Sequence, residues 1–447
     1  MNAGRRQLLL AVALAMVFAG RAMRSAWSTD VLSSDPARHA MNGVALLDMV
    51  REGGMREPVR YLEHYFAHSP VLSMPYHPPL FPAMEAMFLA VFGVHTASSR
   101  LAVATTVFAA VLLLIRVLVQ AGLSATVAFA ATLTFFSLKI TQRLSAEVML
   151  EMPALMFALA ALLFLRGFQE DGSAGRALLA GVFAAAAVWT KQTSFLAMVP
   201  VLTIVFARSW RPIRGRSFWV FEALTIGAVL ALSFLWRLAG IPWHPLNWAK
   251  IGYVGLLVRN VGFYASTIYS HYGTPLILFF ILAALVVLSR PLQPQASRLM
   301  KCVDPICRGW LCSALLLVMI VPAIELRYLI YAFPVAIALM YGMMEAFLLS
   351  WMRSGWVKIV LSACGAAVFL VNLPLQPLVL SGPAEVATRY MQWERAGYSC
   401  VRLWMEVSCS RCAEWIRVMP QPFYAPTNSI GGSTSRPPSR VLRLRTG

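Results

Sequence analysis

Charged residues are scarce in this sequence. They make up 13% of the 447 residues, whereas 59% are hydrophobic, and the mean hydropathy is +0.68. A soluble chain of this length needs more charge to cover its surface. The composition therefore excludes an ordinary soluble globular protein and predicts that most of the chain lies in a lipid bilayer.

The motifs of several common enzyme classes are also missing. The sequence has no P-loop, no dinucleotide-binding fingerprint and no HExxH or GxSxG motif, which argues against an ATP-driven pump, a dehydrogenase and the common hydrolases. Among the seven cysteines, Cys409 and Cys412 form a lone CxxC with no second pair, which disfavours a zinc site and leaves a tail disulfide as an alternative. The sequence indicates no definite cofactor, and a divalent metal is left open.

Acidic residues are few: 19 stand against 38 basic residues, and the net charge is +19. The sequence has no basic patch interleaved with aromatic residues of the kind that binds nucleic acid. Basic residues do collect in the cytoplasmic loops of membrane proteins, where they set the orientation of the chain. We therefore expect membrane lipids, and no nucleic acid, as partners.

Long apolar stretches are what the sequence has in abundance. A helix needs about 20 apolar residues to cross the roughly 30 Å hydrocarbon core of a bilayer. Arg5 and Arg6 before the first stretch also resemble a signal peptide, but the many stretches that follow favour an uncleaved first helix. The sequence predicts an all-α polytopic membrane protein with about eleven transmembrane helices, at residues 7–23, 101–120, 122–138, 150–167, 176–190, 193–207, 218–237, 273–290, 309–324, 328–350 and 356–373.

One further apolar stretch, residues 80–94, decides the orientation of the chain. We expect it to lie in the membrane interface, because the basic loops 208–216, 290–308 and 351–358 then all face the cytoplasm together with the N-terminus. If it crossed the bilayer, all of them would lie outside. The sequence thus predicts a multi-pass protein of the cell inner (plasma) membrane with a periplasmic active site.

This orientation also sets the predicted domain organisation. Residues 1–380 form a transmembrane domain, in which residues 24–100 are a first outer loop with interfacial helices. Residues 381–447 form an irregular tail that is expected to be periplasmic. Within the outer loop, a capping pattern at residues 33–36 predicts an amphipathic helix over residues 37–53, which places on one side Met41, Val44, Leu47 and the region of Val50.

Two outer-loop residues are candidates for chemistry, because polar side chains at membrane depth are costly. Asp35 could act as a general base or hold a metal ion, and it could equally cap the helix that follows it. His77 is held near the lipid headgroups by Pro78 and Pro79. It could donate a hydrogen bond to a phosphate, or be incidental to the start of a helix.

Three glutamates are candidates for binding an acceptor or a metal ion. Glu147 and Glu151 are four residues apart, so we expect them on one helix face at the start of the fourth span. They could bind a cation, accept hydrogen bonds from sugar hydroxyls, or pair with Lys139 and Arg143. Glu85, inside the 80–94 stretch, is the third candidate.

Two basic residues stand at the outer ends of spans. Lys191 follows the fifth span, and Arg327 lies between the ninth and tenth. Together they could form an electrostatic clamp for a phosphate or pyrophosphate. The alternative is that Lys191 extends to the interface and that Glu325 neutralises Arg327.

Four short segments carry a resemblance to a known family: Tyr-His-Pro-Pro-Leu-Phe-Pro to Ser-Arg-Leu at 76–101, Glu-Met-Pro-Ala at 151–154, Trp-Thr-Lys-Gln-Thr at 189–193 and Glu-Leu-Arg-Tyr-Leu at 325–329. In this order they resemble the GT-C superfamily of lipid-linked-sugar glycosyltransferases, especially bacterial members of the protein-mannosyltransferase and aminoarabinose-transferase type. The resemblance covers about residues 5–380. The chain departs from the family in having a single carboxylate in the first loop and a glutamate at the second acidic position.

The resemblance implies transfer of a sugar from a polyprenyl-phosphate donor to a lipid, polysaccharide or protein acceptor on the non-cytoplasmic face. It implies that Asp35 is the base or binds the acceptor, that Glu147 or Glu151 is the second acidic residue, and that Lys191 and Arg327 face the donor phosphate. A base opposite the leaving phosphate predicts inversion at the anomeric carbon.

Two alternatives stay open. The first is a lipid or sugar transporter or flippase without transferase chemistry, but such proteins tend to have internal repeats and polar residues near the bilayer midplane, and the sequence has neither evident repeats nor mid-span charge clusters. The second is an inactive scaffold of the same fold, which the divergent tail leaves open.

Overall fold

The computed structural model describes residues 3–23, 35–68, 72–74, 77–191, 199, 215–238, 254–266, 305–320, 325–349 and 352–372. The chain divides into two units, Met1–Gly397 and Tyr398–Gly447, and all described residues belong to the first. These residues form helices and connecting turns and contain no strand, which confirms the predicted all-α class. The predicted irregular tail, residues 381–447, lies outside them.

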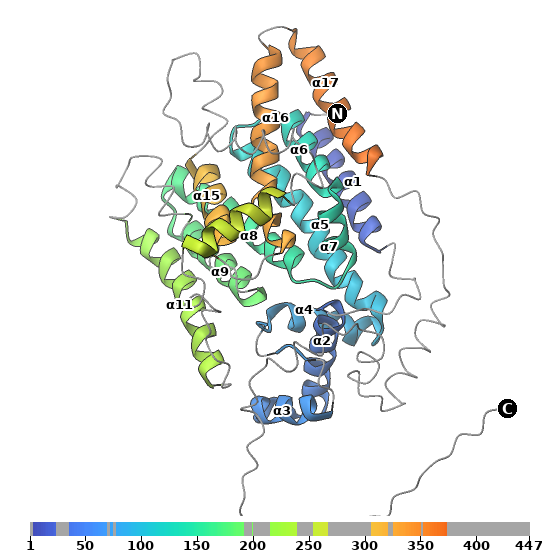
Figure 1. The fold of residues 1–447 in the computed structure, drawn as a ribbon, viewed down its shortest axis with the longest axis vertical. Coiled ribbons are helices and arrows are strands. Elements are labelled where there is room, and N and C mark those ends of the chain that lie inside the picture. The colour runs from blue at the N-terminus through green and yellow to red at the C-terminus, as the bar shows by residue number, and fades with distance from the viewer. Residues whose placement is uncertain are drawn as a thin grey trace, which may run out of the picture. The chain divides into compact units, whose positions relative to one another are not determined.

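The helices follow one another along the chain as Figure 1 labels them. The structure describes α1 (Ala3–Ala22), α2 (Asp35–Arg51), η2 (Gly54–Arg56), α3 (Pro58–His68), α4 (Leu80–Phe92), α5 (Thr96–Gln120), α6 (Ala125–Ser137), α7 (Lys139–Ala146), α8 (Glu151–Asp171), α9 (Ala174–Thr190), α11 (Arg216–Leu238), α15 (Pro305–Ile320), η6 (Leu326–Tyr331), α16 (Phe333–Leu349) and α17 (Ser354–Val371). Residues 254–266 are also helical.

Four of the described helices are long and apolar enough to cross a membrane. Their spanning portions are Thr96–Gln120, Glu151–Phe168, Phe218–Leu238 and Ser354–Val371, and several shorter apolar helices accompany them. The chain is therefore a polytopic membrane protein, as the composition predicts. Of two predicted spans, 193–207 and 273–290, only residue 199 is among the described residues, so the total of eleven stays a prediction.

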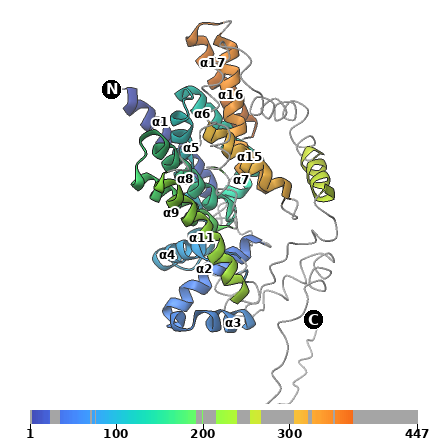
Figure 2. The same cartoon turned by 90° about the vertical axis from the view of Figure 1, so that its left-hand side faces the viewer.

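The packing is centred on α5, the longest described helix. It contacts α1, α4, α6 and α8, and its apolar side chains belong to the largest buried core cluster. On one side α8 packs on α9, which packs on α11, and on another α6 packs on α16 and α17 (Figures 1 and 2). The helix ends near which Asp35, Glu151, Lys191 and Arg327 lie are thus held by one continuous core.

The described residues of the segment 24–100, which is expected to be an outer loop, fold largely as helices. With 13 residues, α4 is about 20 Å long at 1.5 Å per residue, too short for a hydrocarbon core of roughly 30 Å. It packs on α2 and α5, in keeping with an interfacial helix. It ends at Gly93, whose φ of 90° is a backbone conformation that favours glycine.

The prediction for the first helix of the outer loop was wrong in two respects. The helix begins at Asp35 and ends at Arg51, whereas residues 37–53 were expected. Val50 is 62% exposed, although its region was assigned to the apolar side. The reason is that the buried face runs through His39, Gly43 and Leu47, and polar or small residues on it obscure the periodicity.

The prediction that Glu147 and Glu151 share one helix face was also wrong. The short helix α7 ends at Ala146, Glu147 is extended, and α8 begins at Glu151, so a turn separates the two side chains. Pro153 lies in the first turn of α8, where the backbone N–H that proline lacks would have no intrahelical partner. Likewise the predicted span 328–350 is divided into the 3-10 helix η6 and α16.

Candidate functional site

Arg327 is the centre of a cluster of charged side chains. Its Nη1 lies 3.0 Å from Asp35 Oδ2, and its Nε lies 3.3 Å from Glu151 Oε1. Glu325 also pairs with it, with Nη2 donating to Oε1 at 2.9 Å. Three segments separated by up to 292 positions therefore meet at one guanidinium: the start of α2, the start of α8 and the segment around η6.

Lys191 completes the cluster from a fourth segment. The chain becomes extended at Lys191, directly after α9, and Lys191 Nζ donates to Glu151 Oε1. The ammonium also lies 5.3 Å from the centre of the Tyr328 ring, a cation–π contact. With its side chain only 9% exposed, Lys191 does not extend to solvent, so that alternative was wrong. Glu325 does pair with Arg327, as its alternative proposed.

The carboxylates of the cluster differ in accessibility. Asp35 is 35% exposed and Glu325 41%, but Glu151 is fully buried. A buried carboxylate that contacts both Lys191 and Arg327 holds the two cations in place. Asp35 and Glu325 are therefore the carboxylates of the cluster that are open to solvent.

Two histidines lie beside this cluster. The rings of His39 and His77 are 4.8 Å apart between centroids and nearly perpendicular. The pKa of His39 is lowered to about 3, chiefly by burial and then by the positive charges of Lys191, Arg327 and Arg38. Burial also lowers the pKa of His77 well below its usual range.

His39 is the site residue that the sequence analysis missed. A signal was available, because His39 follows Asp35 by four residues and so shares its helix face. The position of His77 is fixed through α2 as well. Asn42 and Ser73 exchange two hydrogen bonds, at 2.8 and 3.0 Å. The backbone N–H of His77 donates to the backbone carbonyl of Ser73 at 2.9 Å.

The segment that carries Arg327 is anchored by the helical residues 254–266. The Tyr264 hydroxyl donates to the Glu325 carbonyl at 3.0 Å. The Asn260 amide donates to the carbonyls of Val318 and Met319 at the end of α15, at 3.1 and 2.9 Å. These bonds fix the backbone on which Glu325 and Arg327 stand.

Two of the predicted site residues are not brought into the cluster. Glu147 pairs with Arg143, Nε to Oε1 at 3.1 Å, which was one of the predicted alternatives. Glu85 is fully buried on α4, and its carboxyl group lies against Gly43 of α2. In the part of the chain that the structure describes, no group of three His, Cys, Asp or Glu side chains is arranged to hold a metal ion.

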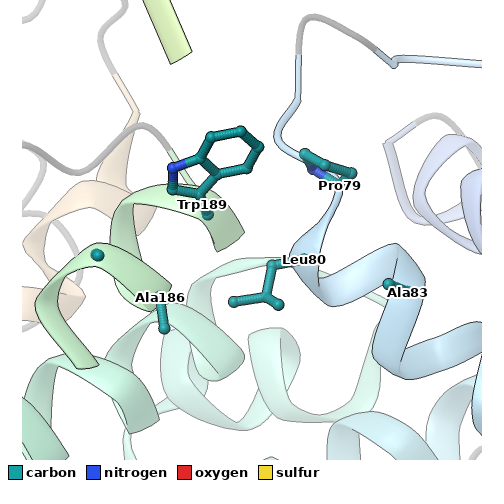
Figure 3. Close-up of a pocket in the computed structure, with 6 residues that line it drawn as sticks. Pro79, Leu80, Ala83, Ala186 and Trp189 are labelled. Carbon is teal, nitrogen blue, oxygen red and sulfur yellow. The ribbon is translucent and has the colours of Figure 1, made fainter. Parts of the chain in front are cut away.

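An apolar groove lies between the start of α4 and the end of α9. Its volume is about 330 Å³, and it is lined by Pro79, Leu80 and Ala83 from the start of α4 and by Ala185, Ala186 and Trp189 from the end of α9 (Figure 3). Along the chain, His77 precedes the groove by two residues and Lys191 follows it by two. The groove is therefore flanked in sequence by two of the candidate phosphate-binding residues.

The chain is an all-α polytopic membrane protein in which Asp35, Glu151, Lys191 and Arg327 meet near helix ends. Residues 76–237 match the family model of the dolichyl-phosphate-mannose-protein mannosyltransferases, a family of the GT-C superfamily. The resemblance to GT-C glycosyltransferases is thereby confirmed for this part of the chain, which holds His77, Glu151 and Lys191. Asp35 and Arg327 lie outside it. A comparison with curated proteins gives no match to this chain.

Proposed function

We propose that this protein is a membrane glycosyltransferase that moves a sugar from a polyprenyl-phosphate donor to an acceptor on the non-cytoplasmic face of the membrane. The matched family supports glycosyltransferase activity in general. The observation that carries the specific proposal is the meeting of Asp35, Glu151, Lys191 and Arg327 from four segments of the chain. An accessible carboxylate beside two immobilised cations has the parts that such a transfer needs.

Asp35 is the proposed general base. Its carboxylate is held by Arg327 on one side, and it is accessible enough to accept the proton of an acceptor hydroxyl or amine. As the acceptor attacks the anomeric carbon, the bond from that carbon to the phosphate oxygen breaks on the opposite face. The product therefore has the inverted anomeric configuration.

Lys191 and Arg327 are the proposed phosphate-binding cations. A guanidinium has five N–H groups. Arg327 donates from Nη1 to Asp35 and from Nη2 to Glu325, and its Nε makes an ion-pair contact with Glu151 without a hydrogen bond. The guanidinium therefore keeps N–H groups that can donate to a phosphate. Negative charge grows on the phosphate as the sugar leaves, and fixed cations stabilise that charge without reorganisation of water.

The orientation and the acceptor are part of the same proposal. The N-terminus lies in the cytoplasm of a cell whose inner membrane holds the protein, because the basic loops then face inward. The donor is carried by a lipid, so the headgroup region is where it meets the cluster. The acceptor is a lipid, a polysaccharide or a protein with a nucleophilic hydroxyl or amine.

The variant Asp35→Asn tests the proposed base. Transfer from a polyprenyl-phosphate sugar, measured in membranes, should fall by about 100-fold or more, because an amide cannot accept the proton. The matched control is Asp48→Asn on the same helix, where Asp48 accepts a hydrogen bond from Tyr65. It should retain wild-type transfer.

The test separates the alternatives. Unchanged transfer by Asp35→Asn at a normal protein level would reduce Asp35 to a structural residue. Movement of the lipid carrier across the membrane with no sugar transfer by the wild-type protein would favour a flippase instead.

A further inference from the structure

The imidazoles of His39 and His77 form a pair whose geometry is built by the fold. His39 is 3% exposed and lies one helical turn after Asp35 on α2. His77 is held by the hydrogen-bonded Asn42 and Ser73. The ring centroids are 4.8 Å apart. Helix α2 carries Asp35 and His39, and through Asn42 it also holds the segment of His77. The two imidazoles are therefore fixed relative to the charged cluster around Arg327.

The Nδ1 atom of His39 is unsatisfied. It is buried, and no group within the described ranges of the chain forms a hydrogen bond with it. Buried polar atoms in proteins are nearly always paired, so an exception calls for a ligand or a functional reason. The exception here lies beside residues that the proposed transfer already uses.

The charges around the pair are mostly positive. Lys191 from the end of α9, Arg327 from η6 and Arg38 from α2 act on His39. Lys191 also acts on His77, and there Asp35 and Glu151 oppose it. A neutral imidazole among cations, with an unpaired ring nitrogen, can bind an anion. The negative charge of a bound anion opposes the effect of the surrounding cations and favours protonation of the ring.

We propose that His39, together with His77, binds the phosphate of the polyprenyl carrier and that the pair takes up one proton as it does so. This inference rests on the proposed function and adds His39 to its phosphate-binding residues. Protonation makes both nitrogens of a ring hydrogen-bond donors, so the ring can then donate to a phosphate oxygen.

The transfer increases the negative charge on the phosphate, which favours a cationic group beside it. When the bond between the anomeric carbon and the phosphate oxygen breaks, its electron pair stays on that oxygen, and a phosphodiester monoanion becomes a monoester dianion. The acceptor proton goes to Asp35. A further proton, taken from the solvent by the imidazole pair, places a positive charge beside the dianion and stabilises it. The product phosphate is therefore bound more tightly at lower pH.

Calorimetric titration of the purified full-length protein with a short-chain polyprenyl monophosphate tests the inference. Titrations in two buffers of different ionisation enthalpy measure proton uptake, and a parallel titration with inorganic phosphate shows whether the headgroup alone suffices. We expect uptake of about one proton near neutral pH and binding that tightens as the pH falls to 6. His39→Gln should bind about 10-fold more weakly and lose most of the uptake.

The matched control is His64→Gln, because His64 is an exposed histidine of the same outer loop. It should behave as the wild type. If His39→Gln does not fold, the proton uptake of the wild type and of His77→Gln still decides the matter. Binding without proton uptake, or unchanged affinity and uptake in a folded His39→Gln, would overturn the inference.

Failure of this inference is distinguishable from failure of the proposed function. If the wild type transfers sugar but phosphate binding does not depend on His39, only the role of His39 is rejected. If the wild type binds phosphate with proton uptake but transfers sugar to no acceptor, the glycosyltransferase function is rejected and the phosphate-binding site is retained.

Discussion

Glu151 and Lys191 form an ion pair that is almost completely removed from solvent. The side chains are 0% and 9% exposed, and Glu151 also neutralises Arg327. Taking two charges out of water is costly, and the attraction between them offsets that cost only while both are present. Removal of one partner should therefore be far worse than removal of both.

The variant Glu151→Gln tests this balance. It keeps the shape of the side chain but leaves the buried Lys191 without its carboxylate, so we expect a loss of about 3 kcal/mol in the free energy of unfolding. The double variant Glu151→Gln/Lys191→Met should recover a substantial part of this loss. Thermal unfolding in detergent measures both. Equal stability of the wild type and the single variant would contradict the assignment.

Some residues of the charged cluster and its surroundings could be identified from the sequence, and others could not. Asp35, Lys191 and Arg327 could be chosen because polar side chains near apolar helix ends are unusual. Which carboxylate each cation contacts could not be predicted, because Glu151 and Arg327 are 176 positions apart and meet only through helix packing. His39 was overlooked because histidines are frequent in the outer loop, and only the fold distinguishes it from His64.

Among the elements, α2 and α4 are in close contact at Gly43 and Glu85. A Cβ added at Gly43 would lie 2.6 Å from Glu85 Oε2 and 2.8 Å from Glu85 Cγ. The buried glutamate fills the space that the glycine leaves open. Because α2 also carries Asp35 and His39, a change in this contact shifts the site.

The variant Gly43→Ala should destabilise the outer loop by about 1–3 kcal/mol through overpacking. Glu85→Ala in the same chain should relieve the clash. Gly227→Ala in α11 is the control, since a Cβ there meets no atom within 4 Å and an alanine favours the helix. Thermal unfolding and protease resistance of the outer loop measure the effect. A Gly43→Ala protein as stable as the control would refute the close packing.

The sequence predicted helices better than it predicted their boundaries. The apolar stretch 101–120 became α5, and its first turn was missed because it is built from Thr96, Ser98 and Ser99. The His95 ring caps that turn by accepting from the Ser98 N–H at 3.1 Å. Such caps depend on local side-chain geometry, which apolar periodicity does not report.

On the scale of the whole molecule, distant segments of the chain converge on one polar site. Four described helices are long enough to cross the membrane, and the core around α5 joins them to the outer loop. Arg327 pairs with the first residue of α2 and with the first residue of α8, so the site exists only when the bundle is assembled. Asp35 and Arg327 also lie outside residues 76–237, so the family match does not include these two residues.

The central claim is that this cluster acts on a lipid-linked sugar, and the most direct test is donor turnover by purified protein in liposomes. The release of polyprenyl phosphate from a panel of polyprenyl-phosphate sugars is compared for the wild type, Arg327→Met and the control Arg143→Met, which breaks only the pair with Glu147. We predict turnover by the wild type and the control, and a loss of about 100-fold or more in Arg327→Met. Equal turnover by all three proteins would contradict the account.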